Sequence, residues 1–186
     1  LIASIPFSLV VGRLVANVDI RDYGDGNPGA TNVKRATGST LWYIVSMLLD
    51  GFKALFPVGI PYWFFGWQGP EIIPVAIAAL LGHAFSLYLR FRGGKAIAST
   101  GGVWIGLIVF EAVLVLPLTL VFWYRVFEGD EWATVLMMLS LLLYLLYTRS
   151  ENGVLFAVWT ANFLIILYKH RSGLGRPPIL KLPKRE

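Results

Sequence analysis

The sequence contains no cysteine and only two histidines, His83 and His170, among its 186 residues. Without cysteine the chain can form no disulfide, and the common cysteine-based zinc sites are excluded. Two histidines are too few for a histidine-built metal site, so we expect neither a metal nor another cofactor. Acidic residues are also scarce, with 11 Asp and Glu against 16 Lys and Arg and a formal net charge of +5. In a chain this apolar, the positive excess suits basic loops or an anionic substrate, and we expect no nucleic-acid partner.

Apolar residues, in contrast, are abundant and make up 56% of the sequence, including 7 Trp, 8 Tyr and 12 Phe. Soluble domains contain about 45–50% apolar residues, so this composition belongs in a membrane. A spanning helix needs about 20 mostly apolar residues. We therefore predict a single integral membrane domain over residues 1–186, an all-α polytopic fold. Its apolar segments are 1–18, 40–66, 72–89, 97–124, 132–148 and 153–168.

The segment 97–124 decides how many times the chain crosses the membrane. Glu111 lies near its middle, where a charge is costly in lipid. If the chain hinges at Glu111, the halves 97–110 and 112–127 form two helices shorter than a full span, and the protein has about seven helices. If the segment is one helix, six crossings result.

The basic residues favour seven helices. That arrangement places the polar loops 19–38 and 90–96 and the basic tail 169–186 on one side of the membrane, and these segments carry most of the Lys and Arg. Basic loops are typical of the cytoplasmic side. We therefore expect the N-terminus outside and the tail in the cytoplasm.

The loop at residues 24–32, GDGNPGATN, begins with the G-x-G-x-x-G spacing of dinucleotide-binding folds, and Asp50 follows near the usual distance of a ribose-binding acid. Such a fold needs a buried strand before the glycines, whereas here the polar sequence DIRDY precedes them. The other glycine cluster, residues 93–95, lacks the first glycine of a P-loop at Leu89 and the Ser or Thr at Ala96. The pattern therefore indicates no nucleotide site.

The same loop is nevertheless suited to phosphate. Its glycines, Gly24, Gly26 and Gly29, let backbone N–H groups turn toward an anion. Side-chain donors follow within the loop at Asn27, Thr31 and Asn32. Arg35 comes one helical turn after Asn32 and can bind phosphate through two parallel hydrogen bonds.

A second basic cluster, Arg90, Arg92 and Lys95, surrounds Gly93 and Gly94 on the same expected side of the membrane. The two clusters together predict the halves of one anionic pocket at the membrane surface. The alternative is that the glycines only form turns and the cations reach lipid headgroups.

Four of the polar residues within the apolar segments are of interest: Ser4, Asp50, Lys53 and His83. Asp50 and Lys53 are three residues apart, which places them on one helix face and favours a structural ion pair. His83 ends the third apolar segment, where a lone histidine is usually a packing residue. Ser4 precedes Pro6, and a serine in that position commonly bonds to freed backbone groups.

Taken together, the motifs resemble those of the bacterial acyl-phosphate:glycerol-3-phosphate acyltransferases, the PlsY family. The matches cover about the first 100 residues, in order. They are Ala3-Ser4-Ile5-Pro6 for the family's G-S-I-P, residues 19–38 for D-I-R-x-x-G-S-G-N-x-G-A-T-N-x-x-R-x-x-G, Asp50 and Lys53 for D-x-x-K, and Gly82-His83, Phe85, Phe91, Gly93-Gly94-Lys95 and Ala98 for G-H-x-F-x-x-x-x-x-F-x-G-G-K-x-x-A.

This resemblance implies a seven-helix enzyme of the bacterial inner membrane whose site faces the cytoplasm. It implies acyl transfer from acyl phosphate to the 1-hydroxyl of glycerol-3-phosphate, which gives lysophosphatidate for phospholipid synthesis. The expected substrate-binding residues are Gly24, Asp25, Gly26, Gly29, Arg35, Gly93, Gly94 and Lys95. The expected catalytic residues are Asn27, Thr31 and Asn32, with Ser4, His83 and His170 in a second rank.

The chain departs from the family pattern at several positions. Asp25 replaces a serine in the glycine loop, and Ala96 replaces a glycine after Lys95. The tail reads His170-Arg171-Ser172-Gly173-Leu174 in place of the family's H-R-x-N-I, and Ala3 replaces the first-motif glycine. Asp25 either accepts the Asn27 N–H in an Asx turn or helps to remove the acceptor's proton.

A transporter or flippase for an anionic solute is the competing class, because basic loops and intramembrane charges would serve it too. A transporter needs a polar path through the whole bilayer. Here the polar motifs gather at one face, which favours the enzyme.

Overall fold

Helices account for nearly all the regular structure in the computed structural model, which describes residues 1–181. Residues 182–186, at the end of the expected basic tail 169–186, lie outside the described part. Five helices are long and apolar enough to cross a membrane, which confirms the expected all-α membrane fold. The helices are α1 (Phe7–Ala16), α2 (Ala30–Thr37), α3 (Thr40–Phe64), α4 (Ile72–Ala84), α5 (Ile97–Val126), α6 (Glu131–Thr148) and α7 (Gly153–Leu174), with short 3-10 turns η1 (Ile2–Ser4), η2 (Ile20–Asp22) and η3 (Leu87–Leu89).

The first apolar segment, 1–18, is not one continuous helix, and it contains one of the helices that we expected to be shorter than a full span. The chain forms η1, passes through Ile5 in extended conformation, and starts α1 only after Pro6. Ten residues of helix are about 15 Å long, roughly half of the hydrocarbon thickness. Lys53 of α3 contributes to the break between η1 and α1. Its Nζ donates to the Ile5 carbonyl at 2.6 Å and holds the backbone there in a non-helical conformation.

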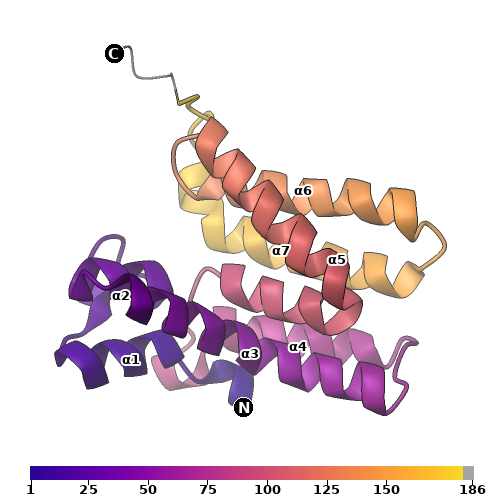
Figure 1. Ribbon diagram of the computed structural model, residues 1–186, viewed down its shortest axis with the longest axis horizontal. Helices are drawn as coiled ribbons and strands as arrows, with labels where there is room; N and C mark the ends of the chain where they lie inside the picture. The colour runs from indigo at the N-terminus through magenta and orange to yellow at the C-terminus, as the bar shows by residue number, and fades with distance from the viewer. Residues whose placement is uncertain (182–186) are drawn as a thin grey trace.

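The hinge expected at Glu111 exists, but it lies at Ile108 and Val109, whose backbone angles are non-helical. Figure 1 shows α5 turning back on itself at this point, so that its two halves run in different directions. The first half packs closely on α3: a Cβ on Gly102 would lie 2.1 Å from the Gly51 carbonyl oxygen. Small residues at such a crossing let two membrane helices approach closely.

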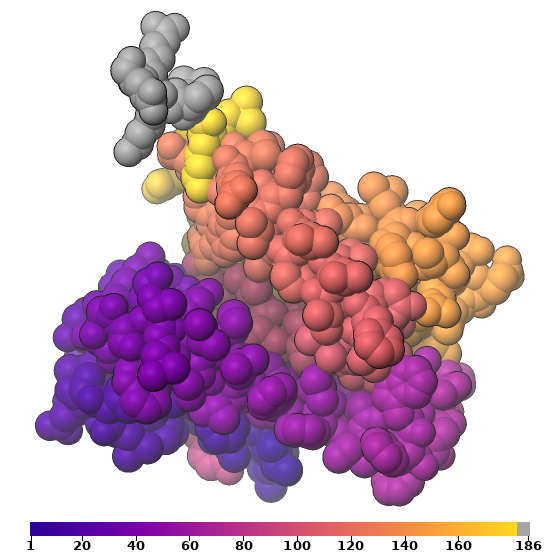
Figure 2. Space-filling model, in the orientation of Figure 1, coloured from indigo at the N-terminus to yellow at the C-terminus, as the bar shows by residue number. Residues whose placement is uncertain are grey.

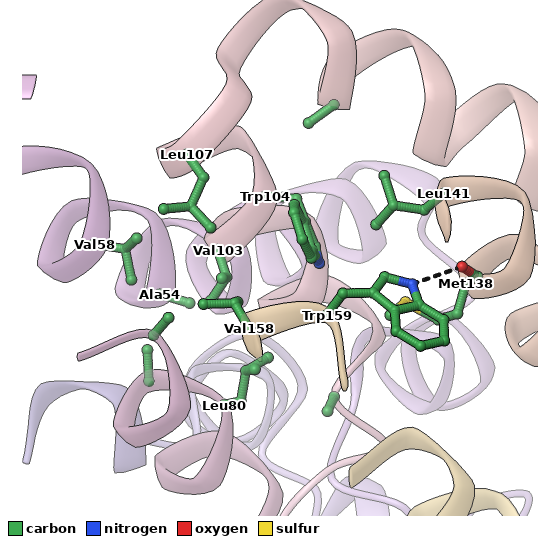
Figure 3. Close-up of a cluster of buried hydrophobic side chains, with 14 of the residues drawn as sticks. Ala54, Val58, Leu80, Val103, Trp104, Leu107, Met138, Leu141, Val158 and Trp159 are labelled. Carbon is green, nitrogen blue, oxygen red and sulfur yellow. Dashed lines mark hydrogen bonds between the residues drawn. The ribbon is translucent and has the colours of Figure 1, made fainter. Parts of the chain in front are cut away.

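The core lies between α3, α4, α5, α6 and α7. Figure 3 shows Trp104 and Trp159 among buried aliphatic side chains of these helices. Both indole N–H groups are satisfied, Trp159 by the Met138 carbonyl at 2.9 Å and Trp104 by Asn162 Oδ1 at 3.0 Å. Asn162 in turn donates to Thr100 at 2.9 Å, so Trp104, Asn162 and Thr100 satisfy one another within the core.

The polar segments meet at one end of the bundle. Figure 1 places the loop that contains α2, the α4–α5 connection and the α5–α6 connection at one end, and the α3–α4 and α6–α7 loops at the other. Lys95 contacts Asp25 and Asp130, and Lys169 contacts Gly93. The expectation that loops 19–38 and 90–96 and the start of the tail share one side is therefore confirmed. In Figure 2 the N-terminal part of the chain, indigo to purple, forms the lower left of the molecule, with the later helices above.

Candidate active site

The glycine loop is a tight turn in which Asp25 has a structural role. Gly24 and Gly26 have φ values of 59° and 70°, a left-handed conformation that glycine adopts without strain. Between them, Asp25 accepts a hydrogen bond from the Asn27 N–H at 3.2 Å. This is the Asx turn that we expected as one role of Asp25. The turn points Asp25 inward, toward groups from α2 and from the α4–α5 connection.

The first turns of α2 complete this loop. Asn32 is buried and donates to both Asp25 Oδ1, at 3.0 Å, and the Asn27 carbonyl, at 2.9 Å. Its own oxygen accepts from Arg35 Nη1 at 2.8 Å. A Cβ on Gly24 would lie 2.1 Å from that same nitrogen, so any larger residue here would displace the arginine from its present position. The one-turn spacing of Asn32 and Arg35 thus brings their side chains to the same place, as expected, and they also bond to each other.

Lys95 is the centre of the site. Its ammonium group lies 2.9 Å from Asp25, 2.8 Å from Asp130 and 3.6 Å from Glu131. These residues come from the glycine loop, the α4–α5 connection and the start of α6, so one side chain joins three segments. Three carboxylates around one ammonium leave this cluster with a negative excess, which Arg35, 3.7 Å from Asp25, reduces.

The charges within the cluster stabilise one another. Burial disfavours the ionised form of Asp25, but hydrogen bonds from Lys95, Asn27 and Asn32 and the charge of Lys95 lower the pKa of its carboxyl below the usual value. Burial likewise opposes protonation of Lys95, whereas its bonds to Asp130 and Asp25 raise the pKa of the ammonium to about 12. Both groups are therefore charged at neutral pH.

Two helix amino ends border Lys95. The N-cap residue of α2, Gly29, and that of α5, Ala96, make no side-chain capping bond. The first N–H groups of each helix consequently have no side-chain cap, and such ends attract anions. Lys95 immediately precedes α5 and contacts the loop that leads into α2, so both ends lie at the same site.

His170 of α7 is fully buried next to this site. It lies beside the Lys95 backbone and within range of the charge of Asp130, yet neither ring nitrogen makes a hydrogen bond of ordinary geometry with the described residues. Buried polar atoms without a partner are uncommon in proteins. Where they occur, a ligand or a water often completes the pairing.

A second polar cluster lies deeper, between α1, α3 and α4. Lys53 donates to Asp50 Oδ1 at 2.6 Å and Ser8 donates to Asp50 Oδ2 at 2.5 Å. Lys53 and Asp50 are almost completely buried. His83 is also buried, with Nδ1 3.8 Å from Asp50. The expected ion pair of Asp50 and Lys53 is therefore confirmed, and it ties the first residues of the chain to α3.

The glycines Gly93 and Gly94 pack against the end of α4. A Cβ on Gly93 would lie 2.0 Å from the His83 carbonyl oxygen, and one on Gly94 would lie 2.3 Å from His83 Nε2. Lys169 donates to the Gly93 and Ala84 carbonyls, each at 2.9 Å. The two glycines thus join His83 to Lys95, and their predicted contact with substrate stays a prediction.

Ser4 is buried at the end of η1. Its carbonyl accepts from Ser86 at 2.5 Å, and a Cβ on Gly82 would lie 3.3 Å from its nitrogen. Ser4 therefore lies against α4 near His83, in the deeper cluster. The structure does not bring it to Lys95, and its catalytic role stays a prediction.

Comparison with known proteins identifies the family. The family model described as glycerol-3-phosphate acyltransferase matches residues 1–177. Glycerol-3-phosphate acyltransferase 2 of a Bacillus cereus strain is 32% identical over 95% of this chain and 86% of its own length. Glycerol-3-phosphate acyltransferase of Staphylococcus haemolyticus is 33% identical over 95% of this chain and 89% of its own length.

The chain belongs to the glycerol-3-phosphate acyltransferase family. Two solved structures agree with this assignment. One is PlsY (YgiH), an integral membrane glycerol 3-phosphate acyltransferase, in its glycerol 3-phosphate form, with a TM-score of 0.82 and 30% identity over 95% of this chain and 86% of that one. The same protein in its lysophosphatidic acid form gives a TM-score of 0.81 at 29% identity. The transporter alternative has no support among these relatives.

Two departures from the family motifs meet at Lys95, although they lie near opposite ends of the sequence. Asp25 contacts Lys95 directly. Gly173, where the family motif has asparagine, leaves the space that Glu131 fills, because a Cβ there would lie 2.3 Å from Glu131 Cγ. A third departure is Ala96, where the family motif has glycine. Its φ of 68° lies in the left-handed region that glycine adopts without strain, which explains why the motif has a glycine here.

The structure therefore brings together Asp25, Asn27, Asn32, Arg35 and Lys95, with His170 beside them. Sequence reasoning missed Asp130 and Glu131. The signal was the acidic run EGDE at residues 128–131, which can pair with a basic cluster at the same end of the bundle. Thr31 lies exposed at the start of α2, and its expected role in catalysis stays a prediction.

Proposed function

We propose that the chain transfers a fatty acyl group from acyl phosphate to the 1-hydroxyl of glycerol-3-phosphate and gives lysophosphatidate and inorganic phosphate. The observation that carries this proposal is the convergence of Lys95, Arg35, Asn32 and two uncapped helix ends at one place, in a member of the acyltransferase family. Two phosphate-bearing substrates need two anion-binding groups, and this site offers them.

The acceptor's phosphate is assigned to Lys95 and Arg35, supported by the glycine loop. Both cations contact carboxylates, so a phosphate bound to Lys95 takes the place of Asp25 or Asp130. A dianionic phosphate with three strong acceptors can replace a single carboxylate. Gly24, Gly26 and Gly29 permit the close approach of the backbone, and Asn27 and Thr31 orient the acceptor.

The donor is already activated, because phosphate is its leaving group. In the transfer the acceptor's hydroxyl oxygen bonds to the acyl carbon, the bond from that carbon to the phosphate oxygen breaks, and the hydroxyl proton passes to the departing phosphate. The protein holds two mutually repelling substrates in contact, which contributes several kcal/mol. Donors aimed at the developing oxyanion, of which His170 is a candidate, contribute about 3 kcal/mol more. Asn32 orients Asp25 and Arg35, to which it is bonded. Ser4 and His83 lie deeper and are proposed to line the path of the acyl carbonyl.

The test is one assay with purified protein, glycerol-3-phosphate and one donor at a time: acyl phosphate, acyl carrier protein loaded with the acyl chain, or acyl-CoA. We expect lysophosphatidate with acyl phosphate only. Transfer from acyl-CoA alone would overturn the proposed donor. Failure with every donor, while glycerol-3-phosphate still binds, would mean that catalysis has been lost.

We further propose that this enzyme resides in the bacterial inner membrane with the Lys95 site facing the cytoplasm and the N-terminus outside. Support comes from the basic residues of the loops at that end. Cysteines at the exposed positions Thr40 and Arg176 should resist impermeant thiol reagents in intact cells and react after lysis. Cysteines at Gln68 and Glu151, at the other end of the bundle, serve as controls and should react in intact cells; the reverse pattern would invert the orientation.

A further inference from the structure

A groove separate from the Lys95 cluster lies between α1 and the α4–α5 connection. Its volume is about 850 Å³, and Figure 1 shows the two segments beside each other at the end of the bundle that carries the polar loops. Its floor is apolar, with Ile5, Pro6, Leu9, Val10 and Leu89, and its rim carries four arginines, Arg13, Arg21, Arg90 and Arg92, together with Tyr88.

The rim has a strong excess of positive charge. Arg13 and Arg21 share one carboxylate, that of Asp19, at 3.4 and 2.6 Å. Arg90 and Arg92 form no ion pair within residues 1–181. The charge of Asp22 also acts on Arg21. The four arginines of the rim still outnumber the two carboxylates, Asp19 and Asp22. Guanidinium groups bind phosphate through paired hydrogen bonds, so the rim suits a phosphate.

The backbone that presents two of these arginines is strained. Arg90 and Phe91 have φ values of 50° and 65°, in the left-handed region that residues other than glycine rarely adopt. Two hydrogen bonds maintain this turn, from the Phe91 N–H to the Ser86 carbonyl at 2.8 Å and from the Arg92 N–H to the Leu89 carbonyl at 3.0 Å. Strain of this kind persists where the position of a side chain has a use.

The surroundings of the groove distinguish a lipid from a free anion. Leu14, Tyr88 and Phe91 flank it and are 80%, 60% and 63% exposed, so large apolar side chains face outward on both walls. In a membrane protein such side chains contact lipid, and aromatic residues gather at the headgroup level. The groove therefore opens sideways to the bilayer, with its arginines at headgroup depth.

We propose that this groove is a binding site for the phosphate headgroup of an anionic phospholipid of the surrounding membrane. The arginines bind the phosphate, and the apolar floor of α1 contacts the upper part of an acyl chain. The bound lipid covers the joint between α1 and the α4–α5 connection, which leads to Lys95. This site is independent of the acyl-transfer reaction.

The test measures lipid retention by native mass spectrometry after the detergent-solubilised protein is titrated with phosphatidylglycerol or phosphatidylcholine. In the groove variant Arg13, Arg90 and Arg92 are changed to Gln, while the Asp19–Arg21 pair stays. In the control variant Arg125, Arg171 and Arg176, exposed arginines outside the groove, are changed to Gln, so the net charge is the same. Each basic residue near a membrane surface contributes about fivefold to binding of an anionic lipid.

We expect about one phosphatidylglycerol per protein to be retained in preference to phosphatidylcholine, a loss of about a hundredfold in the groove variant, and little loss in the control. Equal loss in both variants, or no preference between the lipids, overturns the proposal. Release of the lipid by inorganic phosphate at millimolar concentration also overturns it, because the apolar floor would then contribute nothing. Binding of lysophosphatidate alone would overturn it too, and would make the groove a product site instead.

Melting temperatures of both variants establish that they fold. If the triple variant does not purify, the single change Arg92→Gln, at an exposed side chain without a hydrogen bond in the described structure, should lower retention about fivefold. Arg92→Lys keeps the charge but not the paired hydrogen bonds, so its loss should be smaller than that of Arg92→Gln. Unchanged retention in Arg92→Gln would contradict the proposal as directly as the triple variant.

Discussion

The protein contains two clusters built around a lysine and an aspartate, and they differ in almost every other respect. Lys53 and Asp50 belong to one helix face, are buried, and are satisfied by Ser8 and the Ile5 carbonyl. Lys95 and Asp25 come from different segments, are partly exposed, and share their charges with Asp130 and Glu131. In the first cluster Lys53 and Asp50 pair one to one, whereas the second has more carboxylates than its lysine needs.

This difference separates a structural ion pair from an exchangeable one. A buried charge that loses its partner has no water to replace it, so the Lys53 cluster fixes the position of the chain's first residues on α3. A partly exposed lysine with several carboxylates can exchange one of them for a phosphate at small cost. The comparison predicts that changes in the first cluster affect stability and that changes in the second affect substrate binding and turnover.

The largest expected effect is the loss of stability on removal of one buried partner. Lys53→Met leaves Asp50 buried without its cation, and breaking such a pair costs about 3–5 kcal/mol. Thermal unfolding in detergent should show it. The double variant Asp50→Leu, Lys53→Met should regain much of the loss, because it buries no unpaired charge.

The matched control is the exposed pair of Arg149 and Glu111, which lies 2.5 Å apart at the other end of the bundle. Arg149→Ala should cost no more than about 1 kcal/mol. If Lys53→Met unfolds at the same temperature as the unchanged protein, the buried cluster is not structural.

The next effect is on catalysis, without a matching loss of stability. Lys95→Ala and Arg35→Ala should each lower turnover about a hundredfold or more, the scale of one lost charge-stabilising group in an active site. Arg35→Lys should rescue poorly because lysine cannot bind phosphate through two parallel bonds. Steady-state kinetics and melting curves together test this, and normal kinetics in either alanine variant would remove that residue from the site.

Sequence patterns predicted the local parts of both clusters. The spacing of Asp50 and Lys53 predicted their pair, and the spacing of Asn32 and Arg35 predicted that both side chains reach the same place. Hydropathy together with the charge of Glu111 predicted the hinge in α5 to within a few residues. Each of these depends on residues that are near in sequence, where helical geometry alone decides which side chains meet.

The contacts that depend on the folded chain were not predictable. Asp130 and Glu131 reach Lys95 only because α5 turns back at its hinge, and hydropathy gives no direction to that turn. The break before α1 depends on Lys53 binding the Ile5 carbonyl, a contact between residues 48 apart. The sequence singled out Arg90 and Arg92 but grouped them with Lys95. Their place beside Arg13 and Arg21 in a groove that Lys95 does not line follows only from the fold.

A smaller effect is expected at Asp25. Asp25→Asn and Asp25→Ser keep a side chain that can accept the Asn27 N–H, so the turn and most of the turnover should persist. Because Lys95 then has one carboxylate fewer, the acceptor's phosphate binds more readily, and its KM should fall about fivefold, equivalent to about 1 kcal/mol.

The pH dependence sharpens this prediction. Hydrogen bonds and the charge of Lys95 lower the pKa of Asp25 against the effect of burial, so Asp25 is ionised above its usual pKa and loses its charge only as the pH falls through the lowered value. The difference in KM between the variants and the unchanged protein should therefore be constant across the neutral range. A loss of turnover of about a hundredfold in both variants would instead identify Asp25 as the general base.

The smallest effect is expected at Gly173, and it tests whether Glu131 belongs to the exchangeable cluster. A Cβ at this position would lie 2.3 Å from Glu131 Cγ, so Gly173→Ala must push the carboxylate away. Glu131 is the most distant of the three carboxylates, at 3.6 Å from Lys95, and a pair of this kind contributes at most about 0.5 kcal/mol. The acceptor's KM should therefore fall about twofold.

Glu131→Gln should give the same twofold fall in KM. The double variant Gly173→Ala, Glu131→Gln should give no larger fall, because both substitutions remove the same contact between Glu131 and Lys95. Gly175→Ala is the matched control: a Cβ there meets nothing within 4 Å, so its KM should equal that of the unchanged protein. Additive effects of Gly173→Ala and Glu131→Gln would show that the glycine acts on the site by another route. In that event the two departures from the family motif would be unrelated, and the negative excess around Lys95 would depend on Asp25 and Asp130 alone.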